Sequence, residues 1–449
     1  MTGKELLLQT FQHEKLPSVP WVPFAGVHAG KLKGYSALEV LKDGKKLLSA
    51  LQEVNKQYQP DGQPVLFDLQ MEAEILGCNL HWAEKVPPSV VSHPLGSRME
   101  IPTYLPEKKD GRIPMTLEVM KEFKKTVGDS TALFGLICGP LTLASHLRGT
   151  EIFMDMIDNQ DYTTGLINYT KEVNKRMAEF YIEAGMDIVA IVDPLVSQIS
   201  PVHFKKFLAS PSKDIFSFLK EKKVFSSIFV CGDATKNIEE MCLTGPDSIF
   251  IDENINMVAA KKITDRFNIV IGGNIPLTSI MLLGTQQDNM RFTIDMLDSL
   301  DHHNLVIAPG CDMPYDIPPG NVIGIMQAIR DPETVKHVLI NYHPEQITID
   351  VVLPDYENLH QPLIEVFTVD SETCPACGYM VDAAKLAKEQ YGEKVDFVEY
   401  KITKPENLAR VKKLGIKNLP CIFINGELKF SSIIPGKKEL LSVVERYLK

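Results

Sequence analysis

The sequence predicts an α/β protein in which a (β/α)8 TIM barrel precedes a second, smaller α/β domain. Short apolar runs alternate with helical patterns over most of the chain, which is typical of β-α-β crossovers and a parallel sheet. Eight such runs are present, which is the number that closes this type of barrel. The chain has 449 residues, more than one ordinary hydrophobic core accommodates, so two domains are expected.

The barrel elements can be placed in order along the chain. Val19–Pro23 should be the first strand, and Pro64–Phe67 should be the second, which delivers Asp68 to a loop. The proline-rich residues 80–112 predict an irregular insertion. The later strands are expected at residues 132–137, 187–192, 224–230, 247–251, 268–272 and 305–308. A long helix is predicted over residues 161–184, and a helix at about 321–330 should end the barrel.

The domain boundaries follow from a change of pattern after the barrel. The barrel should occupy residues 1–335, and a link over residues 336–360 should connect it to a small domain over residues 361–449. The predicted order of elements in the small domain is β-α-β-α-β-β-α. Asn425-Gly426 should form the turn of its hairpin.

Composition excludes several classes of partner. The formal net charge of −11 argues against nucleic acid and anionic membrane surfaces. No signal peptide or membrane span is expected, because neither a basic-then-apolar leader nor an apolar run of about 18 residues is present. We therefore expect a cytoplasmic protein. Its eight cysteines predict reduced, reactive or metal-bound thiols in place of a disulfide framework.

Two cysteines follow predicted strands of the barrel directly. Cys231 follows the run that ends at Val230, and Cys311 follows Pro309-Gly310 after another strand. The carboxyl ends of the strands form the reacting face of such a barrel. Two sulfurs there indicate a soft-metal or thiolate site. The other barrel cysteines, Cys78, Cys138 and Cys242, are expected to be small buried hydrophobes.

The small domain carries a C-x-x-C motif between a strand and a helix. The helix N-terminus should favour the thiolate of Cys374, which makes it the nucleophile and Cys377 the resolving thiol. A structural zinc half-site or an inert pair is the alternative. With Leu419-Pro420 before a later strand, residues 361–449 resemble the thioredoxin and glutaredoxin family, which implies a redox-active thioredoxin-like domain. Cys421 departs from that pattern and could place a third sulfur near the pair.

Segments of the barrel resemble the uroporphyrinogen decarboxylase superfamily. They are Pro20–Gly34, Cys138–Gly149, Val192–Pro194, Gly273–Pro276 and Pro309–Asp312. More narrowly, they are similar to its corrinoid-dependent branch, the methylcobamide:coenzyme M methyltransferases and relatives, over about residues 3–330. The resemblance implies a methyltransferase that moves a methyl group between the cobalt of a corrinoid and a thiol or other heteroatom acceptor. Its expected partners are a corrinoid protein or free cobalamin and a small-molecule methyl donor or acceptor.

The resemblance also implies a zinc site that activates the thiol. In that branch a His-x-Cys pair and a distant Cys hold the metal, and Cys231 and Cys311 match the two sulfur positions. Phe229 occupies the histidine position, and phenylalanine cannot bind a metal. Glu253, at the end of the following strand, could be the third ligand, or it could be a solvated or helix-capping acid. The Cys231, Cys311 and Glu253 set should bind zinc more weakly than a site with histidine.

Further residues at strand ends complete the predicted site. His28, Gly139, His146 and Asn274 are expected to contact the corrinoid cofactor, and Asp68 and Asp193 are expected to be catalytic acids. Asp68 could match the catalytic aspartate of the decarboxylases. Residues 24–31 contain no arginine, however, so a polycarboxylate substrate would lack its cationic clamp. A uroporphyrinogen decarboxylase and a non-catalytic corrinoid or metal carrier are therefore the alternatives to a methyltransferase.

Thiol exchange is the predicted role of the fused C-x-x-C domain. Strand-end thiolates without a full ligand set are prone to oxidation, and Cys374 is suited to reduce them through a mixed disulfide. A methyl-accepting sulfur, electron supply to cobalt and docking of another protein are the other possibilities. The reductant role is favoured because only exchange requires the second cysteine, Cys377.

Overall fold

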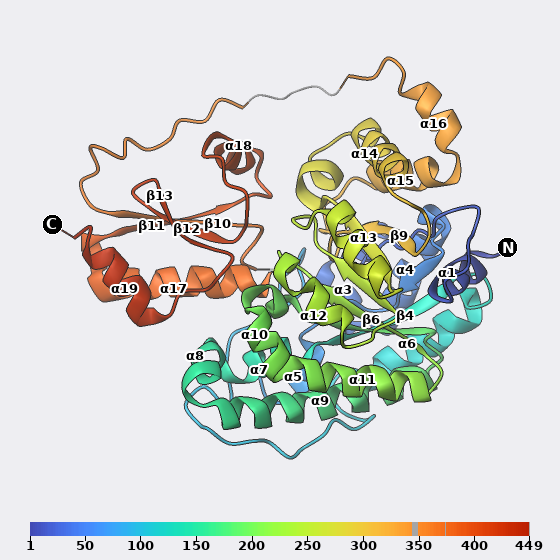
Figure 1. Cartoon of the computed structure of the whole chain (residues 1–449), viewed down its shortest axis with the longest axis horizontal. Coiled ribbons are helices and arrows are strands. Elements are labelled where there is room, and N and C mark those ends of the chain that lie inside the picture. The colour runs from blue at the N-terminus through green and yellow to red at the C-terminus, as the bar shows by residue number, and fades with distance from the viewer. Residues whose placement is uncertain (344–348, 373, 449) are drawn as a thin grey trace. The chain divides into compact units, whose positions relative to one another are not determined.

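The computed structural model describes residues 1–343, 349–372 and 374–448, and it divides into two compact units (Figure 1). The first unit consists of Met1–Val196 and Ser200–His343, and the second contains the C-terminal residues. Of the predicted link over residues 336–360, the first part belongs to helix α16 (Pro332–Val338) and the turn after it. Residues 344–348 of the link lie outside the described residues. Val351 is buried, and Tyr356 donates a hydrogen bond to Glu365 of the second unit.

The first unit is built on one parallel sheet. Its strands, in spatial order, are β1 (Gly62–Pro64), β4 (Ala132–Cys138), β5 (Ile188–Val192), β6 (Phe225–Val230), β7 (Ser248–Ile251), β8 (Val270–Ile275) and β9 (Leu305–Pro309). The order along the sheet follows the order along the chain, as right-handed β-α-β crossovers require. The sequence therefore placed these strands correctly to within a few residues. Strand β8 begins later than predicted because Asn268 adopts φ 52°, which ends the preceding turn.

The segment around Trp21 joins the two edges of this sheet. Trp21 forms a parallel bridge with Ile307 of β9, and its carbonyl accepts the backbone N–H of Asp61 beside β1 at 2.9 Å. The predicted first strand, Val19–Pro23, is thus reduced to a short bridge, but it occupies the eighth position. These bonds pair the edges that would otherwise be left open.

Helices surround the sheet and alternate with its strands (Figure 1). The longer ones are α1 (Gly3–Phe11), α4 (Gly44–Tyr58), α6 (Ile113–Val127), α7 (Pro140–Arg148), α8 (Glu151–Asp158), α9 (Gln160–Glu183), α11 (Ala209–Glu221), α13 (Met257–Arg266), α14 (Gln286–Ser299) and α15 (Pro319–Arg330). Short helices are α2 (His28–Lys31), α3 (Ala37–Lys42), α5 (Met71–Ile75), α10 (Pro201–His203) and α12 (Ile238–Cys242). The predicted insertion is irregular apart from the two-residue strands β2 (Leu80–His81) and β3 (Ser89–Val90).

Phenylalanines fill the interior of the barrel. The ring centroids of Phe24 and Phe229 are 4.7 Å apart, and Phe250 lies 5.1 Å from Phe24 and 5.7 Å from Phe229. Phe67 and Phe134 complete the cluster. Aromatic side chains contribute a large buried area and favourable edge-to-face contacts, so this cluster is a major stabilising part of the core.

The second unit has a four-stranded sheet in the order β11-β10-β12-β13. Its elements are β10 (Leu363–Thr368), α17 (Pro375–Tyr391), β11 (Asp396–Lys401), α18 (Pro405–Lys413), β12 (Cys421–Ile424), β13 (Glu427–Ser431) and α19 (Lys437–Glu445). Strands β10 and β11 are parallel, and β12 and β13 are antiparallel to their neighbours. This order of elements agrees with the prediction. Asn425 and Gly426 both have positive φ, which is the conformation of a tight hairpin turn.

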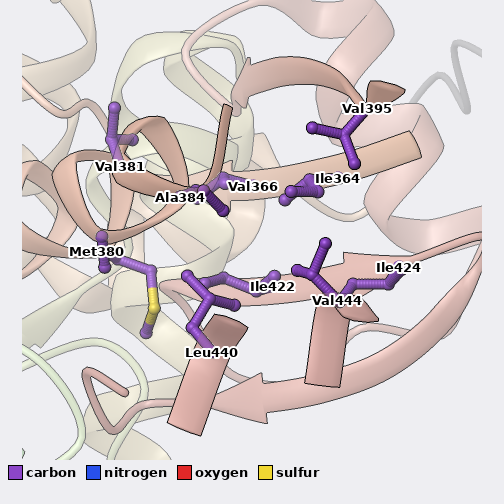
Figure 2. Close-up of a cluster of buried hydrophobic side chains, with 12 residues drawn as sticks. Ile364, Val366, Met380, Val381, Ala384, Val395, Ile422, Ile424, Leu440 and Val444 are labelled. Atoms are coloured by element: carbon purple, nitrogen blue, oxygen red, sulfur yellow. The ribbon is translucent and has the colours of Figure 1, made fainter. Parts of the chain in front are cut away.

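Two apolar clusters hold the sheet of the second unit. Figure 2 shows the larger cluster, in which Ile364, Val366 and Ile422 from the sheet face Met380 of α17 and Leu440 of α19. On the other face, a smaller cluster contains Phe367, Ile402, Val411, Leu419, Cys421 and Phe423. Alternate residues of β10 thus lie on opposite faces, as expected for a sheet buried on both sides.

Within the described residues of the whole chain, no helix combines the length and apolar character needed to cross a membrane.

Candidate functional site

The carboxyl ends of strands β6 and β9 bring Cys231 and Cys311 together. Their sulfurs form a disulfide, and their Cα atoms are 5.7 Å apart. Two strands, β7 and β8, lie between them in the sheet, so the bond crosses the mouth of the barrel. Both cysteines are half-buried. The expectation that the barrel cysteines are reduced is therefore wrong for this pair, because the curvature of the sheet places the two strand ends at bonding distance.

The loops that carry these cysteines are fixed by partly buried hydrogen bonds. The N–H of Gly232 donates to Asp252 at 2.7 Å, next to Cys231. Asp312, next to Cys311, accepts the N–H of Gly26 at 2.8 Å. A Cβ atom at Gly310 would lie 2.7 Å from the backbone nitrogen of Glu253, so the loops before Cys311 and after β7 touch directly. The disulfide thus sits in a rigid frame built from four strand ends.

Two carboxyl groups in this frame, Glu253 and Asp312, have raised pKa values. Burial raises the pKa of Asp312 to about 8. Burial and the nearby Asp252 raise the pKa of Glu253 to about 8. Desolvation penalises the charged form, and one negative carboxylate disfavours the ionisation of its neighbour. The barrel mouth is therefore less negative than its number of acidic residues suggests.

The predicted zinc ligands do not fit a zinc ion in this arrangement. The sulfurs of Cys231 and Cys311 are bonded to each other, and Glu253 accepts a hydrogen bond from the N–H of Leu277. Phe229 is fully buried in the aromatic cluster, and its ring offers no nitrogen donor at that position. Among the described residues there is no group of three His, Cys, Asp or Glu side chains that could hold a metal. A zinc site needs about four ligands, and the predicted set offers three donor residues, two of which are bonded to each other.

A buried ion pair lies near the end of β1. Asp68 is buried and pairs with Arg112, which also donates from Nε to Glu74 at 2.9 Å. The guanidinium of Arg112 lies 5.0 Å from the ring centre of Trp82. Sequence reasoning found Asp68 but missed Arg112, which is 44 positions away at the end of the irregular insertion. The catalytic role of Asp68 stays a prediction, and its carboxylate is already paired with Arg112.

Glu72 is a second acid of this region that burial affects. It is fully buried, and one oxygen accepts the N–H of Cys138 at 3.4 Å, while Oε2 has no hydrogen-bond partner among the described residues. Burial raises its pKa to about 8, so the side chain is largely neutral near pH 7.

Asp193 and Gly139 contact each other at the ends of β5 and β4. Asp193 accepts hydrogen bonds from the N–H of Leu141 and from both the N–H and the hydroxyl of Thr142 at 2.6–3.0 Å, which caps helix α7. Burial raises its pKa to about 6. A Cβ atom at Gly139 would lie 2.3 Å from Cβ of Asp193, so only glycine permits this approach. Capping is the visible role of Asp193, and its predicted catalytic role stays a prediction.

The other predicted cofactor contacts are also internal. His28 Nε2 lies 2.7 Å from the hydroxyl oxygen of Tyr58, and burial lowers the pKa of His28 to about 4. Burial lowers the pKa of His146 to about 3. Asn274 donates its amide hydrogens to the carbonyls of Asp252 and Ile255. Asn274 thus braces the loop after β7, and corrinoid contact by His28, Gly139, His146 and Asn274 stays a prediction.

A cavity of about 490 Å³ opens next to this frame. Glu253, Asn274 and Pro276 line it from the strand ends, and Met257 and Met296 line it from helices α13 and α14. Its wall is mostly apolar with a few polar groups, and neither Cys231 nor Cys311 lines it.

The thiols of the second unit lie at the start of α17. The half-buried Cys374 accepts the N–H of Cys377 at 3.3 Å and so caps the helix. Cys377 is buried, and burial raises its pKa well above its ordinary value. Glu399 of β11 holds the preceding loop, accepting hydrogen bonds from the hydroxyls of Thr368 and Ser371. Cys421 lies in the smaller apolar cluster, where burial raises its pKa to about 12.

Comparisons with known proteins cover the barrel. The family model for uroporphyrinogen decarboxylase (URO-D) matches residues 2–332. Methylcobamide:CoM methyltransferase MtbA of Methanosarcina acetivorans is 25% identical over 338 residues, which cover 74% of this chain and 98% of the relative. Methylcobamide:CoM methyltransferase MtaA of Methanosarcina barkeri is 29% identical over 58% of this chain and 76% of its own length.

A solved structure supports the same fold. A methyltransferase from Methanosarcina mazei superimposes with a TM-score of 0.68 and 22% identity, covering 74% of this chain and 99% of that one. The similarity to these proteins identifies the chain as an enzyme of the methyltransferase kind. With a family model that matches most of its length, the chain belongs to the uroporphyrinogen decarboxylase (URO-D) family.

Proposed function

We propose that this chain transfers a methyl group between the cobalt of a corrinoid and a small thiol or other heteroatom acceptor. The observation that carries the proposal is the alignment with a methylcobamide:CoM methyltransferase over 98% of the relative's length. The barrel mouth, where two cysteines lie at strand ends, is consistent with it. The methylated corrinoid, free or carried by a partner protein, is a substrate in this proposal.

The reaction towards a thiol can be written with its atoms balanced. The thiol loses a proton, its sulfur forms a bond to the methyl carbon, and the bond from carbon to cobalt(III) breaks and leaves cobalt(I). The chain's own residues supply a mouth with fixed loops, in which Asp252 accepts the N–H of Gly232 and Asp312 accepts the N–H of Gly26. Exclusion of water strengthens the interactions that orient a charged nucleophile.

The decarboxylase alternative is less well supported by the same residues. Lys31 in the N-terminal stretch is already paired with Asp316, and Arg112 is paired with Asp68 and Glu74. Neither cation is left to bind several substrate carboxylates, and unpaired buried carboxylates are costly. A carrier without catalysis would bind a corrinoid stoichiometrically and show no turnover.

An acceptor scan tests the proposed function. The reduced protein is mixed with methylcobalamin and a series of thiols, and the methyl-cobalt absorbance is followed while the product is identified by mass spectrometry. We expect loss of that absorbance and a methyl thioether with at least one thiol, and no decarboxylation of uroporphyrinogen. Release of carbon dioxide from uroporphyrinogen would favour the decarboxylase.

For the second unit, we propose a redox-active dithiol of the thioredoxin type. The order of its elements and the contrast between the half-buried Cys374 and the buried Cys377 support it. Cys374 would attack a disulfide and form a mixed disulfide, and Cys377 would then displace the second thiol. The chain should reduce a model aromatic disulfide, and the Cys374→Ser variant should lose this activity.

A further inference from the structure

We propose that Cys231 and Cys311 form a reversible dithiol–disulfide couple whose reductant is the Cys374/Cys377 pair. This inference deepens the proposed function, and it rests on that function only for its activity readout. It assigns a substrate to the C-x-x-C motif, and it gives the barrel cysteines a role that does not require a metal.

The position of the couple makes exchange feasible. Both sulfurs are bonded across the mouth of the barrel, and both cysteines are half-buried, whereas a fully buried disulfide would be closed to exchange. The other cysteines of the first unit, Cys78, Cys138 and Cys242, are buried. Burial also raises the pKa of Cys78 and of Cys242 to about 12, which keeps these thiols protonated and unreactive.

The surroundings favour a redox pair over a metal centre. The side chain at position 229 belongs to the phenylalanine cluster, where its ring contacts Phe24, Phe67 and Phe250. A nitrogen ligand there would require loss of this apolar packing. Two thiols without further ligands oxidise readily to a disulfide, which is the form observed.

The exchange balances as a two-electron, two-proton transfer. The Cys374 thiolate attacks one sulfur of the Cys231–Cys311 bond and releases the other as a thiolate, which takes up a proton. Cys377 then loses its proton and attacks Cys374, which releases the second barrel thiol and leaves a Cys374–Cys377 disulfide. A cellular dithiol would reduce that disulfide again, and a low-molecular-weight disulfide such as oxidised glutathione would reoxidise the barrel pair.

Mass spectrometry of the full-length chain tests the couple without any methyl substrate. After incubation in glutathione buffers of varied ratio, free thiols are alkylated and mapped. We expect Cys231 and Cys311 to lose and regain alkylation together, whereas Cys242 stays in one state. In the Cys231→Ser variant the paired transition should be lost, with Cys311 free in reducing buffer and joined to glutathione in oxidising buffer, and the matched Cys242→Ser variant should behave as the parent chain does.

Trapping identifies the reductant. The Cys377→Ser variant, starting from the oxidised barrel pair, should accumulate a peptide that links Cys374 to Cys231 or Cys311. Absence of that peptide would overturn the assigned reductant, and two permanently free barrel thiols in oxidising buffer would overturn the couple.

In the methyl transfer assay, oxidation should lower the rate of the parent chain at least tenfold and reversibly. If disulfide exchange occurs but no thiol is methylated under any condition, the proposed function fails and the couple stands.

Discussion

Single residues in this protein show how burial changes the chemistry of a carboxyl group. Glu72 has one weak hydrogen bond and no exposed surface, and burial raises its pKa to about 8. The unfolded chain releases this proton near the ordinary value of 4.5. Folding therefore takes up a proton between about pH 4.5 and pH 8, so the free energy of unfolding falls as pH rises through this window.

The Glu72→Gln variant should remove that pH dependence. Glutamine keeps the shape but does not titrate, so at pH 9 the variant should be more stable than the parent chain by roughly 3–5 kcal/mol. At pH 5 the difference should be small. Urea unfolding at pH 5 and pH 9 measures the free energy of unfolding of each protein. The control is Glu74→Gln, which alters the half-exposed partner of Arg112 and should keep the pH dependence of the parent chain. Equal slopes for the parent chain and Glu72→Gln would contradict the assignment.

A substitution of Phe229 tests how much the aromatic cluster stabilises the barrel. Replacement of this fully buried ring by alanine should lower the free energy of unfolding by about 3–5 kcal/mol, because a cavity replaces packed atoms. Phe225→Ala, at the half-buried start of the same strand, is the matched control and should cost less. Guanidinium unfolding of both variants gives the comparison. A smaller loss at position 229 than at 225 would show that the cluster does not stabilise the barrel.

At the scale of elements, the disulfide joins the ends of β6 and β9 across 80 positions of sequence. In the chain-entropy account, closing a loop of that length stabilises the folded state by about 4 kcal/mol, because the unfolded chain loses freedom. Reduction should therefore lower the free energy of unfolding of the barrel by about that amount, which appears as a lower urea midpoint. A double Cys231→Ser, Cys311→Ser variant should show no redox dependence. An unchanged midpoint on reduction would mean that the bond does not constrain the unfolded chain.

The elements were the part of the structure most accessible from sequence. Strand β12 begins and ends where its apolar run does, and helix α9 agrees with the predicted range to one residue, because their patterns depend on local spacing. The site was less accessible. The pairing of Arg112 with Asp68 and the capping by Asp193 depend on contacts between distant segments. Because Cys231 and Cys311 both follow strands, the sequence predicted that they lie on the same face of the barrel. It did not predict that they form a disulfide.

At the scale of the whole molecule, the second unit has its own apolar clusters and should fold alone. A fragment beginning at Ile349 should unfold cooperatively. A fragment beginning at Gln361 should be less stable by about 1–2 kcal/mol, because it loses the buried Val351 and the hydrogen bond from Tyr356 to Glu365. Thermal unfolding followed by circular dichroism compares them. Equal stability would show that residues 349–360 act only as a link.

Methyl transfer to a thiol is the central claim for the whole chain, and one labelling experiment tests it most directly. The reduced full-length protein is given methylcobalamin with a ¹³C-labelled methyl group and the best thiol acceptor, without oxygen. We predict one labelled thioether for each cobalt(I) formed, at a rate that depends on the amount of protein. Unlabelled thiol and intact methylcobalamin after prolonged incubation, also when a corrinoid carrier protein replaces the free cofactor, would contradict the account.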